Sequence, residues 1–359
     1  EAAAGIRSLI TLDDPIGKTT LARELDDGLK LYRVTCPIGV IGVIFESRPD
    51  ALVQIASLCL KSGNSVLLKG GAEAAETNAV LSDIIIKAAA SIDNPIPDGW
   101  LKLLTSREDV LEMLKLDQYI GMIIPRGSNQ FVKYIMDNTS IPVLGHADGV
   151  CHTFVDRYAD LEMALKVIKD AKTQYVAVCN ATETVLVDNS VAGKFLPELK
   201  SAMDRLGVKL YGCEQSAALI GIERAENWHT EYLDYKMSVR VVGGVDEAIE
   251  HINTFGSGHT DAIITMNRES AERFLRGVDS GNVFWNCSTR FSDGFRYGFG
   301  AEVGISTSKL HARGPVGLEG LMSYKYVIYG NGDIVGDYSS GKKAFKHKDI
   351  NENCDLYKN

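Results

Sequence analysis

Between residues 37 and 138 the sequence alternates apolar runs with helical repeats, and this alternation constrains the fold more than any other feature. The run PIGVIGVIFE (37–46) is continuous and β-branched, as in a strand covered on both faces. ALVQIASLCLKSG (51–63) then places apolar residues at helical spacing and stops at glycine. The segments that follow are expected to form strand, helix, strand and helix in turn: NSVLLKGG, EAAETNAVLSDIIIKAAA, QYIGMIIPRGS and NQFVKYIMDN. This order predicts a parallel α/β sheet.

A second series of the same kind begins near residue 150. Its strands are expected at CHTFVD and ETVLVD, and its helices at DLEMALKVIKDAK and AGKFLPELKSAMDRLG. Because 359 residues exceed the usual size of a single core, we expect an α/β chain with two Rossmann-like parallel-sheet domains. The tail YKYVIYGNGDIVGDYSS alternates around Gly-Asn-Gly, which predicts a β-hairpin. An isolated hairpin is marginal, so it should pair elsewhere, for instance with another subunit.

Composition excludes several classes of function. A net charge of −9 argues against a general nucleic-acid binder, which needs a basic face. No apolar run is long enough to cross a membrane. The seven cysteines are odd in number and have no CxxC spacing, which indicates a reducing compartment and no metal site. Because the chain opens at Glu1, without Met, an upstream region is expected and targeting cannot be read.

Standard nucleotide-binding motifs are absent from the sequence. PIGKTT (15–20) has Leu12 where a P-loop needs its first glycine, and GFGAEVG (298–304) has too many spacers for a dinucleotide fingerprint. Two strands nevertheless end in glycine turns. LLKGG places Lys69 and Gly70 at a strand end, and IIPRGSN places Gly127 and Ser128 at the start of a helix, where free amides favour phosphate. Each is also compatible with an ordinary β-α turn; together they predict a dinucleotide site.

Cys179, in VAVCNATETV, is the sharpest catalytic candidate. Most lone cysteines are inert packing residues, and that alternative stands. Here small neighbours leave access, a turn lets successive amides point at one spot, and Asn180 adds a donor. These features suit a thiolate that attacks a carbonyl group whose oxygen becomes an anion.

Six segments together resemble the γ-glutamyl phosphate reductases, a family of the aldehyde dehydrogenase superfamily. The resemblance covers about residues 1–345 and rests on IGVIFESRPD, LLKGG, MIIPRGSNQ, HADGVCH, VCNATETVLV and STRFSDGFRYGFGAEVGISTSKLHARGPVGLEGL. The last block is most similar to the reductase fused behind glutamate 5-kinase in Δ1-pyrroline-5-carboxylate synthetases. The expected domains are 1–150 for the cofactor, completed by about 310–325; 151–309 for catalysis; and 326–359 as an oligomerisation hairpin.

The resemblance implies NADPH-dependent reduction of L-γ-glutamyl 5-phosphate to L-glutamate 5-semialdehyde, with phosphate release, in proline biosynthesis. Cys179 would be the nucleophile and would carry a thioester. A glutamate 5-kinase, fused or separate, would be a partner of a homo-oligomeric enzyme. A cytoplasmic location is expected, or an organellar one if an N-terminal region has been removed.

The resemblance also implies roles for single residues. The cofactor lysine corresponds to Lys69, the ribose-binding glutamate to Glu231 and the oxyanion donor to Arg48, whose guanidinium suits both an oxyanion and a phosphate. His146 stands where hydrolytic members carry a general-base glutamate, which favours a reductase because a thioester must be kept from water; a structural histidine is the alternative. Ala72 replaces a usual basic residue, which weakens the prediction of NADP.

An acidic protein that binds an anion must gather cations at the site. Arg290 follows the apolar strand NVFWN on the side expected to face Cys179, so we predict that it binds the substrate carboxylate, assisted by Ser288 or Thr289. For Arg313 a salt bridge is the favoured interpretation. Two alternatives stay open for the chain: a semialdehyde-oxidising dehydrogenase of the same superfamily, and a catalytically silent member of the fold.

Overall fold

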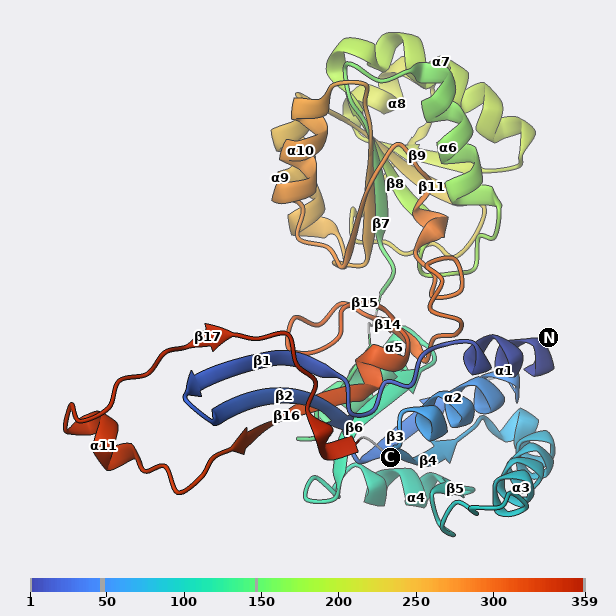
Figure 1. The fold of residues 1–359 in the computed structure, drawn as a ribbon. Helices are drawn as coiled ribbons and strands as arrows, with labels where there is room; N and C mark the ends of the chain where they lie inside the picture. The colour runs from blue at the N-terminus through green and yellow to red at the C-terminus, as the bar shows by residue number, and fades with distance from the viewer. Residues whose placement is uncertain (1, 46–48, 146–147, 358–359) are drawn as a thin grey trace.

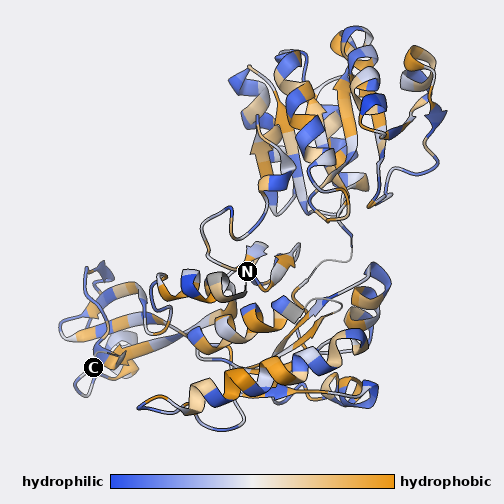
Figure 2. Cartoon of the chain, turned by 90° about the vertical axis from the view of Figure 1, so that its right-hand side faces the viewer, coloured by the Kyte–Doolittle hydropathy of each residue, from blue (hydrophilic) through white to orange (hydrophobic). Residues whose placement is uncertain are grey.

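The computed structural model describes residues 2–45, 49–145 and 148–357, which form two α/β lobes and an antiparallel sheet that projects to one side (Figure 1). In both lobes helices with mixed polar and apolar faces cover apolar strands (Figure 2). This arrangement confirms the α/β class that the alternating pattern predicts.

The first lobe contains a four-stranded parallel sheet in the order β5-β4-β3-β6. Its strands are β3 (Val40–Phe45), β4 (Ser65–Lys69), β5 (Leu101–Leu103) and β6 (Ile120–Arg126). Its helices are α1 (Ala2–Ile10), α2 (Pro49–Lys61), α3 (Ala75–Ala90), α4 (Arg107–Met113) and α5 (Asn129–Asp137). Each strand and helix expected between residues 51 and 138 is present, because burial of the sheet on both faces matches its continuous apolar runs.

The sequence predicted one strand over residues 37–46, and this prediction is wrong. Pro37 ends β2 (Leu29–Pro37), and the chain turns at Gly39, where φ is 121°, before β3 begins. Glycine adopts such a φ without steric cost, so the run serves two different sheets.

The projecting sheet has the order β16-β2-β1-β17 and is antiparallel. The hairpin of β1 (Thr19–Asp26) and β2 turns at Gly28 (φ 76°), and the sequence reasoning missed it although Asp-Gly is a strong turn signal. β16 (Met322–Tyr329) pairs with β2 over eight residue pairs. The predicted hairpin in the tail is therefore wrong: after Gly-Asn-Gly comes the short helix α11 (Val335–Ser339), and the last strand, β17 (Lys348–Asp349), pairs with β1.

The second lobe contains a seven-stranded parallel sheet in the order β10-β9-β11-β8-β7-β12-β13. Its strands are β7 (Cys151–Val155), β8 (Thr182–Asp188), β9 (Lys209–Gly212), β10 (Glu223–Arg224), β11 (Lys236–Val242), β12 (Thr260–Ile264) and β13 (Asn282–Trp285). Its helices are α6 (Leu161–Thr173), α7 (Asn189–Arg205), α8 (Glu214–Ile220), α9 (Val245–Phe255) and α10 (Arg268–Gly277).

After β13 the chain returns to the first lobe. Ala301, Val303, Val316, Leu318 and Leu321 are buried in the same apolar cluster as the strands of the first sheet. This segment includes the small antiparallel pair β14 (Gly304–Ser306) and β15 (Gly314–Val316). The chain thus passes between the lobes again after β13, over residues 292–303 (Figure 1). None of the described helices has the length and apolarity needed to cross a bilayer.

Candidate active site

Cys179 lies in a turn between α6 and β8, three residues before the strand begins. The apolar residues 176–178 form bends rather than a strand, and the amide of Ala181 donates to the carbonyl of Val178 at 3.1 Å. Cys179 is half-buried, whereas its neighbour Asn180 is buried. The turn therefore presents the thiol while the following residue anchors it.

The predicted donor Asn180 uses its side chain to fix this turn. Its Nδ2 donates to the carbonyl oxygen of Ser292 at 2.7 Å, so at least one amide hydrogen is committed to the backbone. The main-chain amides of Cys179 and Asn180, in contrast, have no acceptor among the described residues. These two amides are the donors that the turn offers to an oxyanion.

A row of buried threonine hydroxyls braces the same turn. Thr153 on β7 lies 2.9 Å from Thr182 on β8, and Thr182 lies 3.2 Å from Thr289, oxygen to oxygen. Thr289 donates to the carbonyl oxygen of Asn180 at 2.7 Å. Thr289, which the sequence proposed as a substrate contact, is thus fully buried and holds the cysteine turn against the sheet. Ser288 is also buried, and its hydroxyl accepts from the amide of Arg290 at 3.3 Å.

Arg290, which the sequence predicts to bind the substrate, has hydrogen-bond donors that no described residue uses. Its Nε donates to Gln174 Oε1 at 2.9 Å, while its two terminal amino groups have no hydrogen-bond partner among the described residues. Burial lowers the pKa of Arg290, the nearby Arg296 lowers it further, and Asp293 and Cys179 oppose both effects. Arg290 directly follows Thr289, which donates to the carbonyl oxygen of Asn180 in the cysteine turn, and its role as the substrate-carboxylate residue stays a prediction.

Arg313 is engaged elsewhere. Its Nη1 lies 3.1 Å from Asp279 Oδ1 and its Nη2 donates to the carbonyl oxygen of Asp279 at 2.9 Å. This is the salt bridge that the sequence analysis favoured for it.

A second cysteine lies behind the first. The Sγ of Cys151 donates to the carbonyl oxygen of Cys179 at 3.1 Å, and burial raises the pKa of the Cys151 thiol well above its usual range. Cys151 therefore stays a thiol and is no competing nucleophile, because the thiolate is the reactive form.

Glu231 lies where the two lobes meet. One carboxylate oxygen accepts from the amide of Gly149 at 2.9 Å, and the other accepts from Asn129 Nδ2 at 2.8 Å. Asn129, the first residue of α5, also donates to Asp148 Oδ1 at 2.6 Å. The predicted ribose-binding residue is thus next to the helix start that carries Gly127 and Ser128.

The remaining predicted cofactor residues share one edge of the first sheet. Lys69 ends β4, and Gly127 and Ser128 are exposed between β6 and α5, so both groups lie at the carboxyl ends of parallel strands. Lys69 Nζ donates to the carbonyl oxygen of Gly70 at 2.6 Å, which leaves two of its hydrogens for a ligand. A β-carbon at Gly70 would come within 2.1 Å of Asn78, whose buried Oδ1 has no partner among the described residues. An ammonium, helix-terminal amides and an unused acceptor fit a dinucleotide with its phosphates and ribose hydroxyls.

Two predicted site residues, Arg48 and His146, lie outside the described residues. Among those described, no group of three or more His, Cys, Asp or Glu is placed to hold a metal ion. The sequence reasoning missed Gly149 and Gln174, which contact Cys179 and Arg290. Gly149 stands in HADGVCH, and this glycine after an aspartate was the one available signal.

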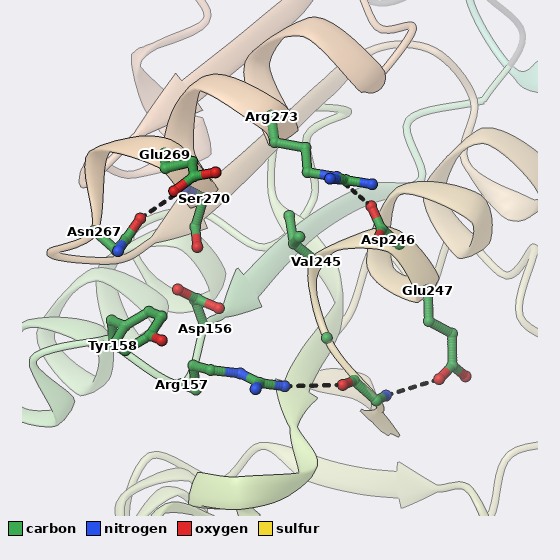
Figure 3. Close-up of a pocket in the computed structure, with 12 residues that line it drawn as sticks. Asp156, Arg157, Tyr158, Val245, Asp246, Glu247, Asn267, Glu269, Ser270 and Arg273 are labelled. Carbon is green, nitrogen blue, oxygen red and sulfur yellow. Dashed lines mark hydrogen bonds and ion pairs between the residues drawn. The ribbon is translucent and has the colours of Figure 1, made fainter.

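A pocket of about 510 Å³ lies at the opposite end of the second sheet, at the carboxyl ends of β7, β11 and β12 (Figure 3). Its two arginines are already paired: Arg157 with Asp188 at 3.0 Å, and Arg273 with Asp246. Because Cys179 lies before the start of β8, at the amino edge of the same sheet, this pocket is not part of the candidate site.

This chain is similar to known proteins over nearly its whole length. The aldehyde dehydrogenase family model matches residues 7–231. A gamma-glutamyl phosphate reductase from Acetivibrio thermocellus is 65% identical over 354 residues, which cover 98% of this chain and 82% of that protein. One from Pelotomaculum thermopropionicum is 67% identical over 354 residues, covering 98% of this chain and 81% of the relative.

Solved structures agree with these relatives. The crystal structure of gamma-glutamyl phosphate reductase from Thermotoga maritima has a TM-score of 0.90 and 41% identity, and the match covers 93% of this chain and 81% of that one. An acetylating aldehyde dehydrogenase from Geobacillus thermoglucosidasius, at 19% identity and a TM-score of 0.66 over 93% of this chain and 88% of that one, shares the fold.

Proposed function

The chain belongs to the γ-glutamyl phosphate reductases of the aldehyde dehydrogenase family, oxidoreductases of proline biosynthesis, and on that premise we propose that Cys179 carries the reaction as a thioester. The observation that supports this role most strongly is the position of Cys179: it is half-exposed in a turn that Asn180 and Thr289 fix, and Arg290 directly follows Thr289.

The proposed first step transfers the acyl group. The Cys179 thiolate forms a bond to the acyl carbon, the bond from that carbon to the phosphate oxygen breaks, and phosphate leaves with the electron pair. The main-chain amides of Cys179 and Asn180 stabilise the oxyanion, and Arg48 joins them if its role follows the resemblance. Asn180 contributes by fixing the turn; a direct donor role for its side chain stays a prediction.

A nicotinamide cofactor supplies the hydride that reduces the acyl carbon. The carbon–sulfur bond then breaks, the semialdehyde departs and the thiolate of Cys179 is restored. Lys69, Gly70, Gly127 and Ser128 are proposed to bind the cofactor's adenosine and phosphates, and Glu231 its nicotinamide ribose. His146 is proposed to contact the substrate from the position where hydrolytic members carry their general-base glutamate.

We propose NADPH rather than NADH as the reductant. The resemblance to the family supports this choice. Two local features oppose it: Ala72 offers no cation for a 2′-phosphate, and the carboxylate of Glu73 lies over Gly71, where an added β-carbon would come within 2.1 Å of it. The preference for NADPH over NADH is tested by measuring kcat/KM with each cofactor. An equal or lower kcat/KM with NADPH would contradict the proposal.

The substrate's carboxylate is proposed to bind the terminal amino groups of Arg290, which the rest of the site leaves available. A bidentate guanidinium–carboxylate contact fixes orientation as well as charge. Ser288 and Thr289 support this contact through the backbone, given their burial.

The larger organisation is also a proposal. We propose a cofactor-binding domain of residues 1–150 completed by about 310–325, a catalytic domain of 151–309 and an oligomerisation extension that includes 326–359. Its support is the shared core of the first lobe and the outer strand β16, on which Tyr324, Tyr326 and Ile328 are more than half exposed. Such an edge favours a homo-oligomer. We also propose that a glutamate 5-kinase supplies the substrate. A reducing compartment such as the cytoplasm is proposed because all seven cysteines are free thiols.

The direct test is NADPH oxidation, followed by absorbance, with freshly generated γ-glutamyl phosphate. Turnover should require the acyl phosphate and release one phosphate per NADPH. Absence of phosphate release at a measurable oxidation rate would contradict the reaction.

A further inference from the structure

A buried ion pair flanks the Cys179 turn and has no part in the chemistry proposed above. Lys172 lies in the last turn of α6 and Glu183 lies in β8. Both side chains are fully buried, and Lys172 Nζ lies 2.7 Å from Glu183 Oε2. Burial raises the pKa of Glu183 to about 7, against the opposing effect of Lys172, and burial lowers the pKa of Lys172. Buried pairs of this kind are often no more stabilising than apolar residues of the same size, so stability alone does not explain it.

The second carboxylate oxygen of Glu183 has a separate task. Oε1 accepts a hydrogen bond from the amide of Leu233 at 3.2 Å. Leu233 has a φ of 50°, in the left-handed region that residues other than glycine, asparagine and aspartate seldom adopt. The residue is 43% exposed, so burial in a core does not hold it there. The bond to Glu183 is the described contact that fixes this strained amide.

The strained residue lies two positions after Glu231, in a segment without regular structure. Glu231 in turn accepts from Gly149, whose backbone packs on Cys179, and from Asn129 at the start of α5. A continuous path of contacts thus runs from the buried pair through Leu233 to the carboxylate that faces the cofactor edge.

We propose that Glu183, held by Lys172, is a positioning residue that sets the backbone at Leu233 and thereby directs the Glu231 carboxylate toward the nicotinamide ribose. This inference rests on the ribose-binding role of Glu231 in the proposed function. The ammonium of Lys172 opposes the effect of burial on the Glu183 carboxyl group and orients it through Oε2, so that Oε1 is left to accept from the Leu233 amide.

Two double variants separate positioning from simple stability. Lys172→Met/Glu183→Gln and Lys172→Met/Glu183→Leu both remove the ion pair, but only the first keeps an acceptor for the Leu233 amide. The readout is the dissociation constant of NADPH from fluorescence titration, with thermal denaturation to confirm that both proteins fold. The KM for pyrroline-5-carboxylate in the reverse reaction serves as a second readout.

The Leu variant should raise the NADPH dissociation constant about tenfold relative to the Gln variant, a change that corresponds to ~1.4 kcal/mol. The KM for pyrroline-5-carboxylate should differ between them by less than about threefold, since both variants carry the same change at Lys172, two residues before the Gln174 that accepts from Arg290. Equal NADPH dissociation constants in the two variants would overturn the inference.

Should the Leu variant not fold, Glu183→Asp replaces it. The shorter side chain keeps a charge for Lys172 but withdraws the acceptor from Leu233, so the same weakening of NADPH binding is expected, and unchanged binding again overturns the inference. Glu231→Ala is measured alongside. If Glu231→Ala leaves NADPH binding unchanged, the ribose-binding role itself is wrong; if it weakens binding while the Leu and Asp variants do not, only the positioning role is wrong.

Discussion

The backbone of Gly149 lies so close to Cys179 that a β-carbon at position 149 would come within 2.2 Å of the Cys179 carbonyl oxygen and 2.5 Å of its β-carbon. Gly149 is also the residue whose amide donates to Glu231. The backbone of this one glycine therefore contacts both the turn of the nucleophile and the Glu231 carboxylate beside the cofactor edge.

Gly149→Ala should lower kcat by about a hundredfold, because the added methyl group displaces the Cys179 turn and a shift near 1 Å is enough to cost that much. Gly193→Ala, in α7, is the matched control, since a β-carbon there would meet no atom within 4 Å. Steady-state kinetics and thermal denaturation of both variants make the comparison. Similar kcat values would show that Cys179 does not depend on this contact.

Arg290→Lys should raise the KM for pyrroline-5-carboxylate about tenfold and leave NADPH affinity intact, since an ammonium cannot reproduce a bidentate guanidinium contact. Arg313→Lys is the control, because a lysine there can still pair with the exposed Asp279. Both variants are assayed in the reverse reaction. If the KM of the Arg290 variant is unchanged, that residue returns to a structural role with Gln174.

Lys69→Ala should raise the KM for NADPH about tenfold with a smaller effect on kcat, because it removes binding common to the ground and transition states. Lys87→Ala in α3 is its control: Lys87 forms an exposed pair with Asp83. Steady-state rates at varied NADPH supply both constants. An equal loss in kcat would place Lys69 in the chemical step instead.

His251 predicts a pH dependence of stability. Burial, with His152 and Arg240 nearby, lowers its pKa from an ordinary value of 6.5 to about 3. Between these values the unfolded chain binds the proton and the folded chain does not, so this contribution to stability is complete above pH 6.5 and is lost as the pH falls toward 3. The loss is at most ~1.4 kcal/mol per pH unit.

Denaturant unfolding at pH 7 and pH 5 checks this expectation. From pH 7 to pH 5 the free energy of unfolding should fall about 2 kcal/mol less in His251→Gln than in the unsubstituted chain, because glutamine does not titrate. The same fall in both proteins would mean that His251 is readily protonated in the folded state.

Several helices and strands of both lobes could be predicted because their periodicity is local, whereas others, among them β5, β9, β11 and α9, were not assigned from the sequence. β4, α2, α5 and β8 appear where apolar spacing placed them. The pairing of β16 with β2 could not be predicted, since it joins residues about 290 positions apart and depends on a hairpin whose Asp-Gly turn was overlooked.

Part of the candidate site could likewise be predicted from the sequence, and part could not. Cys179 and Arg290 could be found because a thiol in a small-residue turn and a cation after a strand are visible locally. The use of Asn180 by Ser292, 112 residues away, and the burial of Lys172 with Glu183 could not be found, because a lysine in a helix normally indicates a solvated face.

The most direct test of Cys179 as acyl carrier of a phosphate-releasing reductase is the reverse reaction: NADPH formation from pyrroline-5-carboxylate and NADP⁺, with and without phosphate, by the unsubstituted chain and by Cys179→Ser. We predict a rate that requires phosphate and is abolished in the serine variant, which should still bind NADPH, because a serine hydroxyl without an adjacent base is a poor nucleophile. NADPH formation at the same rate without phosphate would instead indicate a semialdehyde-oxidising dehydrogenase, and near-native rates in Cys179→Ser would contradict covalent catalysis at this residue.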